Sequence, residues 1–373
     1  MYFNSPIFVL LSLLFAGAHA SRPIWEKDKY NSTNYVCNKP SDCPVSMSCY
    51  DPESKLEVVT QDGYCACYVT IGASGENCEG RGLFNATWFA ILAVIVGGSC
   101  TFFIVKLLWI FMKLHAAKAF SMKKASNIAF VYCLVSVFGI WMYQWSCFMC
   151  AVNAGPFELL ADRTRPLGVA LALIFVILCG FQITVVWMKL ALKSQAKGGA
   201  LEKKVLRIML AVRITQGMVV SICAFSMISG IITIMRLFSV VMCLALGIFF
   251  HFGGNMLAEI LMPKEDTTIE KAVWEKRAEP AKKVLWTASR LKVIITLFAF
   301  LIVLSSVAGL VSADPTKALT GGVLFQVNMV NACFAFHVVI DYLSFGVRKT
   351  LSGGKVTSFG PGTTATSKST TVE

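Results

Sequence analysis

The chain has 373 residues, of which 56% are hydrophobic and 15% charged, and its mean hydropathy is +0.66. A soluble globular domain is about 45–50% apolar, so this composition excludes a water-soluble fold and predicts an integral membrane protein. The net charge of +13 at pH 7 does not indicate a nucleic-acid partner, because the basic residues lie in short clusters between apolar blocks. Clusters in such places flank membrane spans and contact the headgroups of membrane lipids.

Residues 1–20 resemble a secretory signal peptide. Residues 6–17 are almost wholly apolar, and Ala18-His19-Ala20 is a cleavage site of the small-x-small type. A spanning helix needs roughly 20 apolar residues, so this run is too short to cross the membrane. The alternative is an uncleaved anchor, because no Lys or Arg precedes the apolar core. We expect cleavage and an N-terminus on the extracellular or lumenal side.

Residues 21–83 form a polar, cysteine-rich segment after the predicted cleavage site. Six of the 14 cysteines lie in it, namely Cys37, Cys43, Cys49, Cys65, Cys67 and Cys78. A signal peptide delivers this segment to an oxidising compartment, where cysteines at such density form disulfides. A segment of about 60 residues buries too little apolar surface to be stable without cross-links.

The cysteine spacing resembles that of an EGF-like module covering residues 37–78. Successive cysteines are separated by 5, 5, 15, 1 and 10 residues, and the specific parts are Cys65-Ala66-Cys67 and Gly75-Glu76-Asn77-Cys78. Two features depart from the family pattern: the long stretch before Cys65, and the absence of a Gly-aromatic turn after Cys67. A different six-cysteine knot is the alternative. The resemblance implies the bonds Cys37–Cys49, Cys43–Cys65 and Cys67–Cys78.

Two Asn-x-Ser/Thr matches lie near this module. Asn31-Ser32-Thr33 is an N-glycosylation acceptor in the appropriate compartment, so we expect Asn31 to carry a glycan. Asn85 adjoins the first apolar block, and we expect it to stay unmodified. No acidic cluster precedes Cys37, so calcium binding is not indicated, and we expect neither a metal nor a cofactor.

Seven apolar blocks follow, and each is long enough to span a bilayer. They are continuous, unlike the alternating strands of a barrel, so helices are the structure that satisfies their backbone groups in hydrocarbon. The fourth and fifth blocks meet at Arg236, which predicts a tight hairpin with this charge at the turn, and Pro166, Pro263 and Pro315 mark helix ends. The predicted spans cover residues 88–112, 128–152, 167–188, 214–235, 237–262, 293–311 and 319–342.

The predicted fold class is therefore an all-α membrane protein. Its seven-helix transmembrane domain covers residues 84–347, and the small disulfide-rich EGF-like module lies outside the membrane. Residues 348–373 are rich in Gly, Ser and Thr without apolar periodicity, which predicts a disordered cytosolic tail. The charged connection at residues 263–292 either lies on the inner membrane surface as a loop or extends the flanking helices.

The basic residues predict which side each connection faces, because Lys and Arg are enriched in cytosolic connections. The first, third and fifth connections and the tail carry 23 Lys and Arg residues, including those in adjacent helix turns, whereas the opposite connections carry four. The signal peptide predicts the same orientation independently. We expect a multi-pass protein of the plasma membrane or another secretory-pathway membrane, with its C-terminus in the cytosol.

Ionisable residues inside spans are costly and are therefore candidates for function. Those of the fifth and seventh helices recur every four residues, so each set lies on one helix face. We expect Arg213 to neutralise Glu259 or Asp341, because an unpaired buried charge costs several kcal/mol. The alternative is that both carboxylates reach headgroup water and cap helix ends. The predicted intramembrane polar cluster comprises Arg213, His251, Asn255, Glu259, His337 and Asp341.

No catalytic arrangement is found in the sequence, and we do not expect an enzyme. An intramembrane metal hydrolase needs three or more converging His or acidic ligands, whereas the mature chain has His115, His251 and His337 without a His-x3-His pair. A retinal-binding opsin needs a lysine within the last helix, and the nearby Lys317 precedes that helix.

Seven spans, an outside N-terminus and a Ser/Thr-rich tail resemble the layout of G-protein-coupled receptors. The local motifs of that family's main class are missing, since the third helix ends in Trp187-Met188-Lys189 without Asp-Arg-Tyr. The resemblance implies a receptor-like protein with an extracellular protein or carbohydrate ligand and a cytosolic signalling partner. A transporter or channel that uses the polar faces of the fifth and seventh helices is one alternative. An adhesion or structural membrane protein without signalling is the other.

Overall fold

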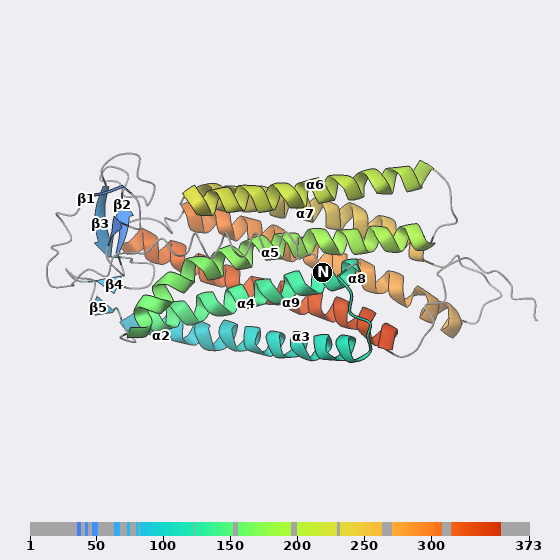
Figure 1. Ribbon diagram of the computed structural model, residues 1–373, viewed down its shortest axis with the longest axis horizontal. Helices are drawn as coiled ribbons and strands as arrows, with labels where there is room; N and C mark the ends of the chain where they lie inside the picture. Colours follow the sequence, from blue (N-terminus) through green and yellow to red (C-terminus); the bar gives the residue numbers. More distant parts are fainter. Residues whose placement is uncertain are drawn as a thin grey trace, which may run out of the picture.

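The computed structural model is a bundle of long, roughly parallel helices, with small disulfide-linked strands beyond one end (Figure 1). It describes residues 36–38, 42–43, 47–50, 63–67, 73–74, 80–81, 83–122, 124–151, 156–194, 200–229, 232–262, 271–307 and 315–351. The predicted signal peptide, the glycosylation site at Asn31, Cys78 and residues 352–373 of the tail lie outside the described residues.

Seven helices of the described part are long and apolar enough to cross a membrane, as the seven apolar blocks predicted. The first span combines α2 (Leu83–Leu92), the π-helical segment η5 (Ala93–Gly97) and α3 (Gly98–Ala116). The other spans are α4 (Ala125–Ala151), α5 (Pro156–Ser194), α6 (Ala200–Ser229), α7 (Ile232–Leu261), α8 (Lys271–Val307) and α9 (Pro315–Leu351).

The positions of the helices differ from the prediction at Pro166 and at Arg236. The start of α8 decides between the two alternatives left open for residues 263–292. α5 continues through Pro166, because a proline near a water-facing end removes one backbone hydrogen bond, which water can replace. α6 ends at Ser229 and α7 begins at Ile232, so Arg236 lies within α7 and not between the two helices. α8 begins at Lys271, so the charged connection extends a flanking helix.

The centre of the bundle is α5, which packs against α4, α6 and α7. In its apolar window 83% of the residues are buried, against 22% for α6, which lies at the periphery. The indole of Trp187 in α5 is fully buried and makes edge contacts with Phe250 of α7 and Tyr342 of α9. These aromatic contacts join three helices in one apolar core.

The closest helix pair is α4 with α5, which share the most extensive interface of the bundle. A Cβ added to Gly139 would lie 2.6 Å from the backbone nitrogen of Ala172, and one added to Gly168 would lie 2.8 Å from the carbonyl oxygen of Gly139. At the same crossing, the Ser136 hydroxyl donates a hydrogen bond to the Ala172 carbonyl at 3.0 Å. Small residues at such crossings let helix backbones approach in a membrane, where no hydrophobic force holds helices together.

The described strands form two small antiparallel sheets. β3 (Gly63–Cys67) lies between β1 (Val36–Cys37) and β2 (Met47–Tyr50), and β4 (Ala73–Ser74) pairs with β5 (Gly80–Arg81). In the three-stranded sheet Cys49 lies opposite Cys65. The second sheet leads directly into the membrane, because β5 ends two positions before the first residue of α2.

Candidate functional site

The polar residues of α7 share one face, as their spacing predicted, but this face belongs to the outer surface of the bundle. His251, Asn255 and Glu259 are exposed and continue a stripe of exposed apolar side chains that includes Leu244 and Ile248. The structure therefore does not bring the α7 residues together with polar groups of other helices in a central cluster.

The structure gives the two remaining charges of the predicted cluster other partners than expected. The exposed Arg213 of α6 donates a hydrogen bond to the side-chain oxygen of Gln216 at 3.3 Å. Asp341 of α9 forms an ion pair with Lys283 of α8. Lys283 was not predicted as a partner because it lies in the charged segment outside the apolar blocks, whereas α8 begins twelve positions earlier, at Lys271.

The Lys283–Asp341 ion pair joins α8 to α9 near the end of the bundle opposite the strands. Both side chains are partly buried, with 24% and 29% of their surface exposed. The Lys283 ammonium also lies 4.6 Å from the centre of the Trp286 ring, which favours a cation. Lys106 of α3 and His337 lie close enough to act electrostatically on the Asp341 carboxylate. Three helices thus contribute charged groups at this level.

A second polar series crosses the bundle through α6, α5 and α4. The amide of Gln216 donates to the side-chain oxygen of Gln182 at 3.2 Å, and the amide of Gln182 donates to the carbonyl of Ala125 at 3.1 Å. Both glutamines are buried, and Arg213 extends the series to the bundle surface. Buried amides cost free energy unless they are hydrogen-bonded, so these contacts define how the three helices pack.

A third polar contact links α4 with α9 in the interior. The amide of Gln144 donates to Gln326 at 2.8 Å, and the amide of Gln326 donates to the Tyr143 hydroxyl at 3.3 Å. Farther along α9, Asn328 and Asn331 donate to backbone carbonyls of α8. These residues were not predicted, because the predicted cluster was built around the ionisable groups of the spans. The sequence does contain a feature that could have identified them, since Gln and Asn inside apolar spans usually form hydrogen bonds with a neighbouring helix.

A small cavity of about 10 Å³ lies within the bundle. Its lining is wholly apolar and comes from α4, α5, α8 and α9, including Tyr143, Phe298 and Phe325. A space of this size holds about one water molecule, and an apolar space of this kind stays dry. The cavity offers no polar route for an ion or a solute.

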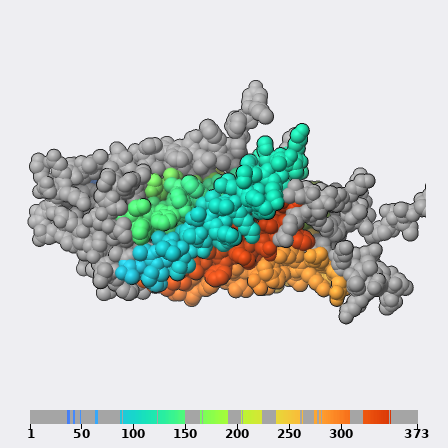
Figure 2. Space-filling view, turned by 90° about the horizontal axis from the view of Figure 1, so that it is seen from below, coloured from blue at the N-terminus to red at the C-terminus, as the bar shows by residue number. Residues whose placement is uncertain are grey.

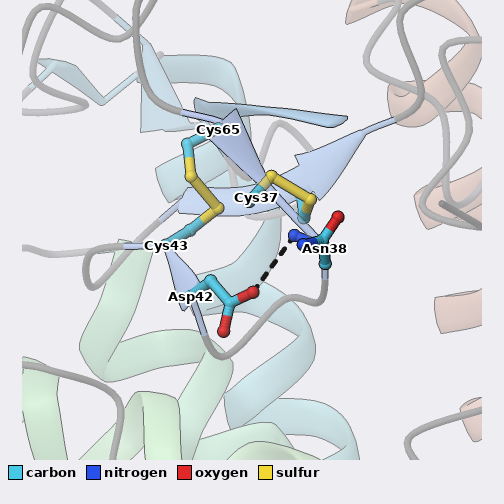
Figure 3. The surroundings of a disulfide bond; sticks show 6 residues. Cys37, Asn38, Asp42, Cys43 and Cys65 are labelled. Atoms are coloured by element: carbon cyan, nitrogen blue, oxygen red, sulfur yellow. Dashed lines mark hydrogen bonds between the residues drawn. A yellow bond between two sulfur atoms is a disulfide. The ribbon is translucent and has the colours of Figure 1, made fainter. Parts of the chain in front are cut away.

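Four buried cysteines, three of them in strands, form the centre of the described part of the module. Cys37 is bonded to Cys49 and Cys43 to Cys65 (Figure 3), and all four are buried. These pairs match the first two bonds that the EGF-like resemblance implied. The third bond, Cys67–Cys78, remains a prediction because Cys78 lies outside the described residues.

Two further features of the module bear on what it can bind. Beside the disulfides, the backbone amide of Asn38 donates to the Asp42 carboxylate at 3.1 Å (Figure 3), a hydrogen bond between the neighbours of Cys37 and Cys43. The sulfurs of Cys37, Cys43 and Cys65 lie within 4.8 Å of one another. Each of them is bonded to another sulfur, so this group offers no thiolate to a metal ion.

No protein-family model, no curated protein and no solved structure matches this chain. The class of the protein therefore rests on its fold. Seven apolar helices pack into one bundle, and a disulfide-linked β-structure precedes the first of them. The chain is a multi-pass integral membrane protein, and the part that the structure describes contains seven helices able to span a membrane.

Proposed function

We propose that this chain is a membrane receptor-like protein. Its disulfide-linked module binds an extracellular protein or carbohydrate, and its helix bundle signals to the cytosol. A series of contacts supports this proposal, because it connects the module, through the first span, to the opposite end of the bundle. The orientation rests on the charge of the connections, because their excess of Lys and Arg supports a cytosolic location for the opposite end.

The module has the features of a rigid binding head. Two antiparallel sheets and two buried disulfides hold its short strands, and the pairing supports an EGF-like module. One residue separates β5 from α2. A linker of that length couples the β4–β5 sheet to the first helix, so we expect a ligand that tilts this sheet also to displace α2.

The first span contains a π-helical segment at the point where it meets α4. Such segments are rare and often lie at functional sites. Gly97 of η5 faces Trp145 and Gln144 of α4, and Gln144 bonds to Gln326 of α9. A displacement of the first span therefore acts on a polar contact that positions α9.

The Lys283–Asp341 ion pair is the element that we expect to switch. It joins α8 and α9 at the proposed cytosolic end, and its partial exposure allows water to replace the contact when the helices separate. A receptor needs two arrangements of its cytosolic end with different stability, and a ligand shifts their populations.

Signalling by variants of this pair tests the proposal without a known ligand. Lys283→Gln and Asp341→Asn should each raise basal activity several-fold in at least one reporter of cyclic AMP, calcium or arrestin recruitment, because each removes a contact of the resting state. The exchange Lys283→Asp with Asp341→Lys should return the signal toward that of the wild type. Surface expression is matched by flow cytometry.

Arg207→Gln is the matched control, because Arg207 is an exposed cation of α6. It should leave every reporter unchanged. If all variants reach the cell surface and no reporter responds to either single substitution, the receptor proposal is wrong, and a module used for adhesion alone becomes the better account.

A further inference from the structure

The face of the bundle formed by α3, α9 and α8 has a chemical gradient along its middle helix. Figure 2 shows these three helices side by side, with α9 between the other two, and both neighbours contact α9. The outward stripe of α9 starts with the exposed Val327 and Phe334 and continues with the exposed His337 and the half-buried Asp341. The stripe is thus apolar toward the bundle centre and polar toward the end opposite the strands.

Contacts between α8 and α9 fix the level of the charged groups on this face. Lys283 meets Asp341, and the amide of Asn331 donates to the Ile294 carbonyl at 3.0 Å, so the two helices are antiparallel. Arg290 follows Lys283 by seven residues and therefore lies about 10 Å deeper in the bundle, near the level of Phe334.

Two cations lie close to the ring of Trp286 at the edge of this face. The guanidinium of Arg290 lies 4.1 Å from the centre of its ring, and the Lys283 ammonium lies 4.6 Å from it. The ring is half-buried and packs against the apolar core. Tryptophan in this situation is typical of the headgroup level of a membrane.

The positive charge of this face exceeds its negative charge. Asp341 is neutralised by Lys283. Lys106 of α3 and Arg290 of α8 add two positive charges on opposite sides of α9, and neither is paired with a carboxylate among the described residues. Guanidinium and ammonium groups placed in this way form charge-assisted hydrogen bonds with phosphate oxygens.

We infer that this face binds one anionic phospholipid of the adjacent leaflet. Its phosphate lies between Lys106 and Arg290, with Trp286 at headgroup depth, and an acyl chain follows the α9 stripe over Phe334 and Val327. A water-soluble phosphate ester would satisfy the cations but would leave the apolar stripe unoccupied. The apolar part of the α9 stripe therefore favours a lipid over a water-soluble phosphate ester. This inference does not depend on whether the bundle signals.

Lipid retention by the purified full-length protein tests the site. Native mass spectrometry in detergent compares phosphatidylserine with phosphatidylcholine of the same acyl chains at equal mole fraction. The wild type should retain phosphatidylserine about 10-fold better, as expected for two cations that act on one net negative headgroup. The double variant Lys106→Gln with Arg290→Gln should lose this preference. Water-soluble glycerophosphoserine should not displace the lipid.

Lys203→Gln with Arg207→Gln is the matched control, because it removes two exposed cations from α6, which packs on α5 and α7. It should keep the preference. Equal loss in both double variants would overturn the site in favour of diffuse surface charge, and displacement by glycerophosphoserine would overturn the lipid as its ligand.

A second measurement, on the wild type, covers the case in which the Lys106→Gln with Arg290→Gln variant does not fold. A photoactivatable phosphatidylserine should label α9 peptides that contain Phe334 and His337. Labelling spread evenly over the seven spans, or confined to other helices, would also overturn the inference.

Discussion

Replacing Gly168 by leucine should abolish the folded protein. The missing side chain of Gly168 lets α5 approach α4 so closely that an added Cβ would lie 2.8 Å from the Gly139 carbonyl oxygen and 2.8 Å from the Tyr143 nitrogen. Both obstacles are backbone atoms, which cannot rotate away. Even Gly168→Ala should lower the free energy of unfolding by about 3 kcal/mol, the upper part of the range for overpacking.

Gly217→Ala provides the matched control for this prediction. Gly217 is an exposed residue of α6, and a Cβ added there meets no atom within 4 Å. Because alanine is the better helix former by about 1 kcal/mol, this variant should melt at or above the temperature of the wild type. Both variants are purified and heated, and size-exclusion chromatography measures the fraction that stays folded at each temperature. If Gly168→Ala and Gly217→Ala melt at the same temperature, α4 and α5 do not cross at Gly139 and Gly168.

Removing one disulfide should unfold the extracellular module and leave the bundle intact. Cys43→Ser with Cys65→Ser deletes a buried cross-link, and loss of such a bond from a small domain costs about 2–5 kcal/mol. The short strands have little apolar core to compensate. Limited proteolysis should therefore cut residues 21–83 rapidly in the variant and slowly in the wild type, while the thermal transition of the helices stays unchanged.

A non-reduced digest of the wild type adds an independent measurement of the same bonds. Mass spectrometry should find peptides linked as Cys37–Cys49 and Cys43–Cys65, and the EGF-like resemblance adds Cys67–Cys78. Free thiols at the first four positions, or equal proteolysis of the variant and the wild type, would contradict the prediction.

The number and the approximate positions of the spans could be predicted from the sequence, because the bilayer imposes a length and a composition that each block satisfies locally. The ends of the helices could be predicted less well. α5 runs through Pro166 and α8 starts at Lys271, outside the apolar blocks. These extensions depend on packing against neighbouring helices and on water at the bundle end. Neither can be predicted from how apolar a segment is.

The partners of the polar residues could not be predicted, because helical spacing defines a face without showing what that face meets. His251, Asn255 and Glu259 share a face of α7, yet that face lies outside the bundle. The partner of Asp341 comes from a helix extension that contains Lys283. The buried contacts of Gln182 and Gln216 depend on how α5 and α6 rotate toward each other, which only the packed bundle determines.

We expect seven helices to cross the membrane, with the disulfide-linked module on one side and the basic connections on the other. Epitope tags inserted between consecutive spans, followed by antibody staining of intact and permeabilised cells, test this topology. Tags in the module and at residues 152–155 should be stained in intact cells, whereas tags at residues 195–199 and at the C-terminus should be stained only after permeabilisation. Staining of the tag at residues 195–199 in intact cells would contradict the account.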